Sequence, residues 1–424
     1  LHTEVCAMKQ QYALLAVVSL YLAGFQTAKA QQPTEAPTGY STPTYADGPG
    51  TRSTGNGFTA PDVFTGDQAT FEEVDGVDKG LGPTFNARSC ADCHQTPVTG
   101  GSSQVSEFRI GHRDSQGHFV NPSLTVNHGQ TQIASRSLVN DRAVCAEAQA
   151  VAPASENVRT FRMSLPILGD GFIEAIPDST LLAIAQQQRS RTRSIAGQAI
   201  QVPVMEGPPG TTRVGRFGWK AQQASLLSFS ADAYLNEQGI TSRLLPTDVT
   251  NVCDTVDDPE DEENDIDHFA AFMRGTLAPP QDATVMATQD AQTGKQLFSQ
   301  IGCALCHVSS ITTAPSGTVL NGGTFTVNDA LGNKVIHPYS DFLLHNVGTG
   351  DGIQQNGPPE TANKLRTPPL WGLRTRDRLM HDGLSATREN AIGRHGGEAT
   401  SVTNNFFRLS STQKAQLLKF LSGL

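Results

Sequence analysis

Two short cysteine motifs are the part of this sequence where residue type and spacing most directly indicate chemistry. Cys90-Ala-Asp-Cys93-His94 and Cys303-Ala-Leu-Cys306-His307 both follow the pattern C-x-x-C-H. Two thiols one helical turn apart can each form a thioether with a haem vinyl group, and the adjacent histidine can bind the iron. The sequence therefore predicts two covalently bound haem c groups. The predicted attachment residues and proximal iron ligands are Cys90, Cys93, His94, Cys303, Cys306 and His307.

Two other chemistries use cysteine pairs at this spacing, and the surrounding sequence disfavours both. A thioredoxin-like pair needs a βαβ context, whereas residues 294–303 have the apolar spacing of a short amphipathic helix leading into the motif. A structural zinc site needs further Cys or His ligands at close spacing. Because the motif occurs twice, a chance match is also disfavoured.

Cys145 and Cys253 lie outside these motifs. In an oxidising compartment such a pair predicts a structural disulfide, with two unpaired buried thiols as the alternative. A catalytic dithiol is a weaker interpretation, because the two residues are far apart in sequence and neither belongs to a C-x-x-C pair.

The N-terminus has the features of an export signal. Lys9 supplies a positive charge, residues 12–25 form an apolar stretch, and Ala28-Lys29-Ala30 offers small residues for cleavage. The apolar stretch is shorter than the roughly 20 residues that cross a bilayer, so an uncleaved anchor is disfavoured. We predict a signal peptide over residues 1–30 with the true start at Met8, a periplasmic location and no stable membrane span.

Composition excludes several classes of protein. The 424 residues are 37% hydrophobic and 17% charged, which fits a globular chain and excludes a polytopic membrane protein and a wholly disordered one. The formal net charge of −10 leaves no basic field for phosphates, so nucleic acid is not expected as a partner. A basic protein partner suits this charge better.

The chain divides into four expected segments. After the signal peptide, residues 31–57 are rich in Pro, Thr, Ser and Gly and predict a disordered linker. Residues 58–280 form the expected N-terminal haem c domain with insertions, and residues 281–424 the expected C-terminal cytochrome c domain. Proline residues near Thr276–Pro280 mark the boundary between them.

Apolar spacing predicts helices over residues 179–188, 265–274 and 411–424. Turn-rich sequence over residues 320–336 predicts a short β-hairpin. The expected fold class is therefore mainly α, with two cytochrome c-like haem domains, long loops and short β-hairpin insertions.

Residues 253–267 are strongly acidic and contain little apolar side chain. They lack the twelve-residue calcium-loop pattern with its central glycine. A solvated acidic loop is therefore favoured over a dedicated Ca²⁺ site.

Several strings between residues 58 and 424 occur in an order that resembles a known family. They are Gly80–Asn86, Gly169–Pro177, Gly215–Lys220, Leu277–Pro280, Tyr339–Asp341 with Leu344-His345, Arg366–Gly372, His381–Gly383 and His395–Glu398. The sequence resembles the bacterial di-haem oxidoreductases of the di-haem thiol oxidoreductase type, which are distant relatives of di-haem cytochrome c peroxidases. The thiol chemistry in that name has no support here beyond Cys145 and Cys253.

The resemblance implies two cytochrome c-like domains in the periplasm, with one haem relaying electrons and the other reactive. The expected activity is peroxidase-like: the N-terminal haem reduces hydrogen peroxide, and the C-terminal haem receives electrons from a small cytochrome c or cupredoxin. One alternative is a pure electron-transfer di-haem cytochrome without substrate chemistry. Another is a haem-dependent oxygenase.

The resemblance also suggests further iron ligands. In the peroxidase relatives, the distal ligand of the second haem follows an H-[DN]-G motif at the spacing that separates His381 from His395 here. It therefore implies His395 as the distal ligand of the C-terminal haem. His345, His381 and Met380 are rivals, and a surface histidine is the alternative. For the first haem, the candidates are His112, His118 and His128, or an open iron.

Two residues in the family strings are candidates for catalysis. Glu174 lies where the relatives carry an acid or amide near the distal pocket, so it could move a proton; a helix-capping or salt-bridged glutamate is the alternative. Trp219 could shorten electron transfer between the haems, and its neighbours Arg216 and Lys220 could pair with haem propionates. Ordinary core packing is the alternative for Trp219.

Overall fold

The computed structural model describes residues 32–41, 54–133, 136–192 and 194–424. Residues Thr34–Leu424 form one compact unit. The predicted signal peptide over residues 1–30 and residues 42–53 of the predicted linker lie outside the described residues. In the described ranges, no helix is long and apolar enough to cross a membrane.

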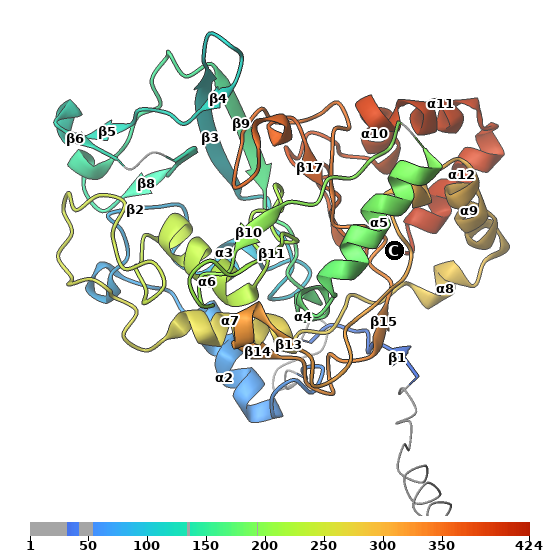
Figure 1. Cartoon of the computed structure of the whole chain (residues 1–424), viewed down its shortest axis with the longest axis horizontal. Coiled ribbons are helices and arrows are strands. Elements are labelled where there is room, and N and C mark those ends of the chain that lie inside the picture. Colours follow the sequence, from blue (N-terminus) through green and yellow to red (C-terminus); the bar gives the residue numbers. More distant parts are fainter. Residues whose placement is uncertain (1–31, 42–53, 134–135, 193) are drawn as a thin grey trace, which may run out of the picture. The chain divides into compact units, whose positions relative to one another are not determined.

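Eleven α-helices lie in the described part of the chain (Figure 1). They are α2 (Pro61–Glu72), α3 (Cys90–Cys93), α4 (Asp170–Glu174), α5 (Asp178–Arg191), α6 (Leu226–Ala233), α7 (Asp265–Gly275), α8 (Ala283–Met286), α9 (Gln289–Gln300), α10 (Arg388–Gly393), α11 (Thr400–Arg408) and α12 (Ser411–Leu421). The helices expected over residues 179–188, 265–274 and 411–424 correspond to α5, α7 and α12, so these three predictions are confirmed.

The strands are short and form several small sheets. They are β1 (Thr34–Glu35), β2 (Thr84–Phe85), β3 (Ser106–Arg113), β4 (Phe119–Val120), β5 (Thr125–Val126), β6 (Thr131–Gln132), β7 (Leu138–Val139), β8 (Arg142–Ala143), β9 (Val158–Met163), β10 (Gln201–Pro203), β11 (Thr212–Val214), β12 (Ile311–Thr312), β13 (Val319–Leu320), β14 (Phe325–Thr326), β15 (Lys334–Ile336), β16 (Leu344–His345) and β17 (Leu365–Arg366). The longest pair is antiparallel β3 and β9, with Ser106 opposite Met163, and β4 and β7 also pair with β3 (Figure 1).

The expectation of a mainly α fold is wrong. The described structure is 33% helical and 15% strand. Most strands have two or three residues, too few to show the alternation of apolar and polar side chains by which strands are predicted. Their physical role is to pair the backbone N–H and C=O groups of long loops that would otherwise lie unpaired. The expected hairpin is present as antiparallel β13 and β14.

The compact unit begins with a short strand at Thr34. β1 pairs in parallel with β15, with Thr34 opposite Lys334, and Ala36 is buried. This pair lies within the segment predicted to be a disordered linker. Strand pairing stabilises it through backbone hydrogen bonds, which a sequence poor in apolar side chains can still form.

A large hydrophobic core joins α2, α4, α5, α6 and α7 with residues from the later part of the chain. Phe64, Phe172 and Phe272 belong to it, and so do Phe325 and Phe342. This core therefore contains side chains from both sides of residue 280.

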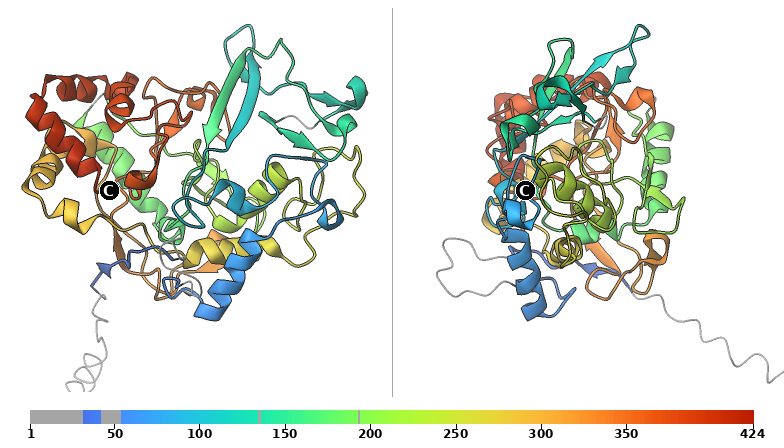
Figure 2. Two further views of the ribbon diagram at one scale, coloured as in Figure 1. Left: turned by 180° about the vertical axis from the view of Figure 1, so that it is seen from behind. Right: turned by 90° about the vertical axis from the view of Figure 1, so that its left-hand side faces the viewer.

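A second core lies among the C-terminal helices. α9 packs against α12, and Figure 2 shows the red helices α10, α11 and α12 beside α9. Gly294 permits this contact, since a Cβ atom there would lie 2.1 Å from the carbonyl oxygen of Gln416. Ser410 and Gln413 form a reciprocal capping box that fixes the start of α12. The close pair of helices supports the segment that follows α9, which carries the second cysteine motif.

Candidate functional site

The second cysteine motif borders a large cavity. α9 ends at Gln300, Gly302 adopts φ +106°, and the short 3-10 helix η6 (Cys303–Leu305) places Cys303, Cys306 and His307 in the cavity wall. The space between the walls, counted with the open mouth, is about 1820 Å³. Apolar lining residues include Phe298, Leu370, Leu373, Leu379, Ile392, Phe406, Leu417 and Leu421. This lining suits a large, flat, mainly apolar ligand.

His307 is oriented by the backbone. Its Nδ1 lies 2.9 Å from the carbonyl oxygen of Tyr339, so Nδ1 donates the hydrogen bond and Nε2 keeps its lone pair. Burial lowers the pKa of His307 to about 4. A neutral imidazole fixed through Nδ1 is the form in which histidine binds metal ions.

His395 follows α10 and lines the same cavity. Its Nδ1 lies 2.7 Å from the carbonyl oxygen of Ala391, so its Nε2 is also left with a free lone pair. Burial lowers the pKa of His395, and His395 in turn lowers the pKa of His307. Two segments far apart in sequence thus bring two neutral histidines to one cavity.

The rival residues also line this cavity, but their contacts differ. His345 lies with Nε2 2.9 Å from Asp341 Oδ2 and Nδ1 2.9 Å from Glu398 Oε2. Burial disfavours the charged ring, yet the two carboxylates raise the pKa of His345 well above its usual value. A histidine that donates from both nitrogens has no lone pair for a metal. His381 lacks an orienting bond at Nδ1 within the described structure, and Met380 is its neighbour in the wall.

Buried polar atoms in the cavity wall lack partners among the described residues. They are Thr349 Oγ1, Arg376 Nε, His381 Nδ1 and Arg388 Nε. Unpaired buried donors are costly, and arginine donors suit carboxylates such as the two haem propionates. Apolar walls, two thiols, two neutral histidines and unpaired donors together fit a haem. Sequence reasoning missed the arginines, although residues 366–394 contain several of them.

The first cysteine motif occupies α3. The hydroxyl of Ser89 accepts a hydrogen bond from the N–H of Ala91 and caps the helix. His94 Nδ1 lies 3.1 Å from the carbonyl oxygen of Gly101, and burial lowers the pKa of His94. A Cβ atom on Gly101 would lie 1.9 Å from the carbonyl oxygen of Thr96, so this turn requires glycine. His94 therefore has the same orientation through Nδ1 as His307.

The segment after the first motif also forms part of the C-terminal cavity. Thr96 and residues 102–104 line it, together with residues 163–165. Trp219 lines the same cavity and donates from Nε1 to the carbonyl oxygen of Met163 at 2.8 Å. Residues that follow the first motif thus line the same cavity as the second motif, and so does Trp219.

The three histidines considered as ligands of the first haem make contacts outside the first cysteine motif. His112 Nδ1 lies 2.9 Å from Glu156 Oε2, and His118 Nδ1 lies 3.4 Å from Asp114 Oδ2. His128 lies in a turn with φ +53°. None of the hydrogen bonds found in the described structure links these side chains to the first motif.

Glu174 does not line the cavity. It is fully buried and accepts hydrogen bonds from Arg274 Nε at 2.7 Å, the N–H of Leu226 at 2.9 Å and Asn321 Nδ2 at 3.0 Å. Burial would raise the pKa of Glu174, but Arg274 lowers it. These contacts are those of the salt-bridged and capping alternative.

Arg216 and Lys220 have protein partners. Lys220 Nζ donates to three backbone carbonyl oxygens and lies 3.3 Å from Asp351 Oδ1, and Arg162 binds the same carboxylate at 2.7 Å. Arg216 pairs with Asp178 and with backbone carbonyl oxygens. Neither side chain is therefore available for haem propionates.

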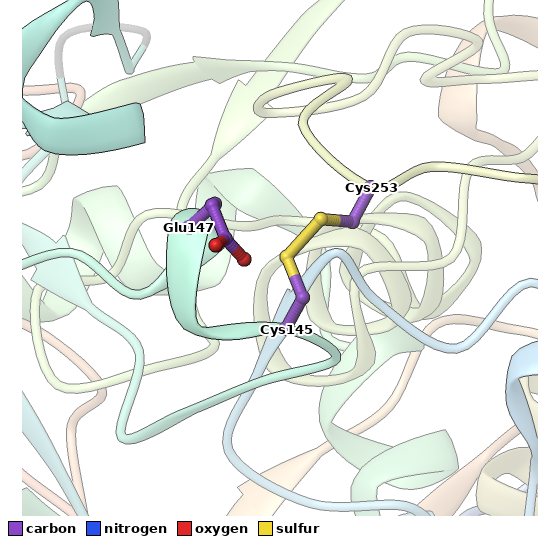
Figure 3. A group of neighbouring side chains, drawn as sticks. All are labelled: Cys145, Glu147 and Cys253. Carbon is purple, nitrogen blue, oxygen red and sulfur yellow. A yellow bond between two sulfur atoms is a disulfide. The ribbon is translucent and has the colours of Figure 1, made fainter.

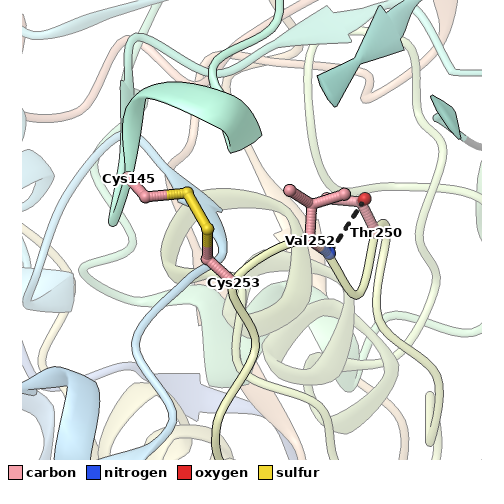
Figure 4. Close-up of a disulfide and its surroundings, with 4 residues drawn as sticks. All are labelled: Cys145, Thr250, Val252 and Cys253. Carbon is pink, nitrogen blue, oxygen red and sulfur yellow. Dashed lines mark hydrogen bonds between the residues drawn. A yellow bond between two sulfur atoms is a disulfide. The ribbon is translucent and has the colours of Figure 1, made fainter. Parts of the chain in front are cut away.

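Cys145 and Cys253 form a disulfide, which confirms the predicted pair (Figure 4). Figure 3 shows Glu147 beside it. Because each sulfur is bonded to the other, neither thiolate is available to a metal ion. In the same loop, the N–H of Val252 donates to Thr250 Oγ1 at 3.4 Å (Figure 4).

One cysteine motif lies in the wall of a cavity that fits a haem, and a second motif has a histidine oriented in the same way; together they indicate a protein of the di-haem class. The chain belongs to the family described as "Di-haem oxidoreductase, putative peroxidase", whose family model matches residues 145–424. Membership implies two haem groups. The matched range includes the second cysteine motif, and the first precedes it.

Solved structures give weaker likenesses. Hydrazine synthase of Kuenenia stuttgartiensis is 13% identical with a TM-score of 0.39, and the match covers 93% of this chain and 100% of that one. A MauG-like protein associated with microbial copper homeostasis is 18% identical with a TM-score of 0.31, over 61% and 89% of the two chains. The diheme peroxidase BthA of Burkholderia thailandensis is 13% identical with a TM-score of 0.32, over 74% and 94%. A comparison with curated proteins gives no significant match.

Proposed function

We propose that this chain is an exported di-haem c-type cytochrome with peroxidase-like activity. In this proposal Cys90 and Cys93 attach one haem and Cys303 and Cys306 the other. The first haem is reactive, and the second relays electrons.

The observation that carries this assignment is the pair of histidines in the C-terminal cavity. His307 and His395 each present a free Nε2, and each is fixed by a backbone carbonyl oxygen. His307 and His395 would together hold the iron of a haem bound in this cavity, and a haem held by two histidines would suit electron transfer. Within the described residues, no hydrogen bond links His112, His118 or His128 to the N-terminal motif, and this supports an iron there that is open to a small oxidant.

The chemistry that the haems supply is the transfer of two electrons to hydrogen peroxide, which takes up two protons and gives two waters. The protein's own residues orient the side chains that would hold the haems. Gly101 and Tyr339 fix the two proximal histidines through their carbonyl oxygens. Trp219, held by the carbonyl oxygen of Met163, lines the cavity of the second motif and is the proposed relay.

The donor and location follow from charge and from the disulfide. A net charge of −10 suits a small basic cytochrome c or cupredoxin as electron donor. The disulfide between Cys145 and Cys253 suits an oxidising compartment such as the periplasm. The signal peptide proposed over residues 1–30 would deliver the chain there.

The test is to express the chain with the haem c maturation machinery and to record absorption and EPR spectra. Spectra are taken of the oxidised and half-reduced forms, with and without hydrogen peroxide. We expect one low-spin and one high-spin ferric signal, and a change of the high-spin signal on adding peroxide. Mass spectrometry should show two haems that remain attached after denaturation.

Two low-spin signals that do not respond to peroxide in either redox state would contradict the peroxidase-like proposal and leave a pure electron carrier. Haem that is released by denaturation would contradict covalent attachment.

A further inference from the structure

A buried tyrosine hydroxyl lies between two carboxylates near the first cysteine motif. Tyr234 is the first residue of the π-helical turn η5 (Tyr234–Gln238), which follows α6, and its side chain belongs to the large hydrophobic core. Its hydroxyl lies 3.2 Å from Asp265 Oδ2, at the start of α7, and 3.5 Å from Asp75 Oδ2, in the loop after α2. The hydroxyl can therefore donate its proton to either carboxylate.

This group of side chains lies beside the first cysteine motif. The side-chain amide of Gln238 lies 3.4 Å from Cys90 Sγ at one of its two polar atoms and 3.0 Å from Asp75 Oδ2 at the other. Burial and the charge of Asp75 raise the pKa of the Cys90 thiol. The hydroxyl of Tyr234 and its carboxylates are thus close to the cysteine that would attach the first haem.

Packed aromatic rings connect Tyr234 to His94. The ring of Tyr234 meets Phe269 edge to face, with the centroids 5.0 Å apart, and Phe269 lies 6.0 Å from Phe71. Phe71 lies 6.3 Å from the imidazole of His94. These are the spacings of rings in contact. α2 and α7, which carry Phe71 and Phe269, pack against each other (Figure 1), so an electron can pass between Tyr234 and His94 through packed rings alone.

The carboxylates give the hydroxyl a place to leave its proton. Burial and the charges of Asp75 and Asp265 raise the pKa of Tyr234, so the phenol keeps its proton while the ring is reduced. Burial and the charges of Glu73 and Asp265 raise the pKa of Asp75 to about 7. Asp265 is half-buried and has the shorter bond to the hydroxyl, so it is the better placed base.

We propose that Tyr234 is a redox-active residue that gives one electron to the first haem after an oxidant has removed an electron there. The electron leaves the phenol ring of Tyr234 and passes through Phe269 and Phe71 towards His94. The O–H bond breaks, and its proton moves to the Asp265 carboxylate. The products are a neutral tyrosyl radical, a protonated Asp265 and a haem that has regained one electron.

The residue would hold one oxidising equivalent away from the first haem when the electron donor is slow to arrive. An electron from the donor protein and the proton from Asp265 then restore the tyrosine and the carboxylate. The inference rests on the proposed peroxidase-like function, which supplies hydrogen peroxide as the oxidant.

The test uses the full haem-loaded chain without an electron donor. It is oxidised either with hydrogen peroxide or with photogenerated tris(bipyridine)ruthenium(III), which removes one electron and needs no peroxide chemistry. Rapidly frozen samples are examined by EPR. With both oxidants we expect an organic radical signal that narrows when the tyrosines carry ring deuterium. Tyr234→Phe should abolish this signal. Tyr40→Phe is the matched control and should keep it, because the hydroxyl of Tyr40 bonds no carboxylate in the described structure.

A second pair of variants tests the proton acceptor. Asp265→Asn keeps the size of the side chain and removes the base, so the radical yield should fall by about tenfold or more while Tyr234 stays in place. Asp267→Asn, in the same helix, is the control and should keep the yield, since that carboxylate pairs with Arg243. An equal yield in the two variants would contradict the transfer of the proton to Asp265.

A radical signal that persists in Tyr234→Phe, or that ring deuterium leaves unchanged, would overturn the proposal. So would the absence of a radical with both oxidants. If peroxide leaves the haem spectra unchanged while the ruthenium oxidant still gives the Tyr234 signal, the peroxidase-like function fails and the redox role of Tyr234 is supported. If peroxide changes the high-spin haem signal but neither oxidant gives a radical that depends on Tyr234, the peroxidase-like function is supported and the redox role of Tyr234 is rejected.

Discussion

At the scale of single residues, the sharpest question is which side chain would hold the second haem's iron together with His307. His395 has the backbone bond that orients a ligand, and His381, in the same cavity, lacks one within the described structure. His395→Ala should therefore convert the C-terminal haem from a low-spin to a high-spin ferric signal, whereas His381→Ala should leave it low-spin. EPR of both variants decides between them. Conversion by His381→Ala alone would assign the ligand to His381 instead.

Lys220 tests the buried charges beside the cavity. Lys220 and Asp351 are both fully shielded from solvent, and Arg162 shares the carboxylate. Removing one partner leaves the others without full compensation, so Lys220→Met should lower the free energy of unfolding by about 3–5 kcal/mol. The exposed pair of Lys79 and Glu73 provides the control, and Lys79→Met should cost less than about 1 kcal/mol. Urea unfolding of the two variants measures the difference. An equal loss of unfolding free energy in both variants would contradict the larger contribution expected of the buried Lys220.

The same group predicts a pH dependence. Burial would raise the pKa of Asp351, but Arg162 and Lys220 lower it to about 2. The folded pKa thus lies below that of an unfolded aspartate, near 3.9. The unfolded chain then binds the proton first as pH falls, so this stabilisation is complete above about pH 4 and is lost between about pH 4 and 2. Asp351→Asn should flatten the pH dependence of the unfolding free energy in that window. An unchanged slope would contradict the assigned pKa.

At the scale of elements, the contact of α9 with α12 controls the position of the second motif. Gly294→Ala would place a methyl group 2.1 Å from the carbonyl oxygen of Gln416, so the helices must separate. We expect a loss of about 1–3 kcal/mol in stability and a lower fraction of haem-loaded chain. Gly66→Ala in α2 is the control: nothing lies within 4 Å there, and alanine should stabilise the helix by about 0.5–1 kcal/mol. Equal effects of the two changes would exclude this role of Gly294.

Elements also show which features the sequence could reveal. The apolar spacing of α5, α7 and α12 repeats over several turns, so these helices were predictable. β1 and β15 have two and three residues, and their pairing depends on backbone groups that are identical in every sequence. The same distinction holds for the groups of polar side chains. Cys303–His307 can be predicted from a repeated sequence motif, whereas Asp248 comes close to Asp258 and Glu260 only in the folded chain. Contacts that form only in the tertiary structure leave no local sequence pattern from which they could be predicted.

At the scale of the whole molecule, the disulfide closes a loop of 108 residues that begins before β9 and ends before α7. Closing so long a loop removes many conformations from the unfolded chain, and such bonds typically contribute about 2–4 kcal/mol. The double variant Cys145→Ser with Cys253→Ser should therefore have a free energy of unfolding that is lower by about 2–4 kcal/mol, and its stability should no longer change on adding reductant. Wild type should become less stable in reductant, and its two free thiols should appear only then.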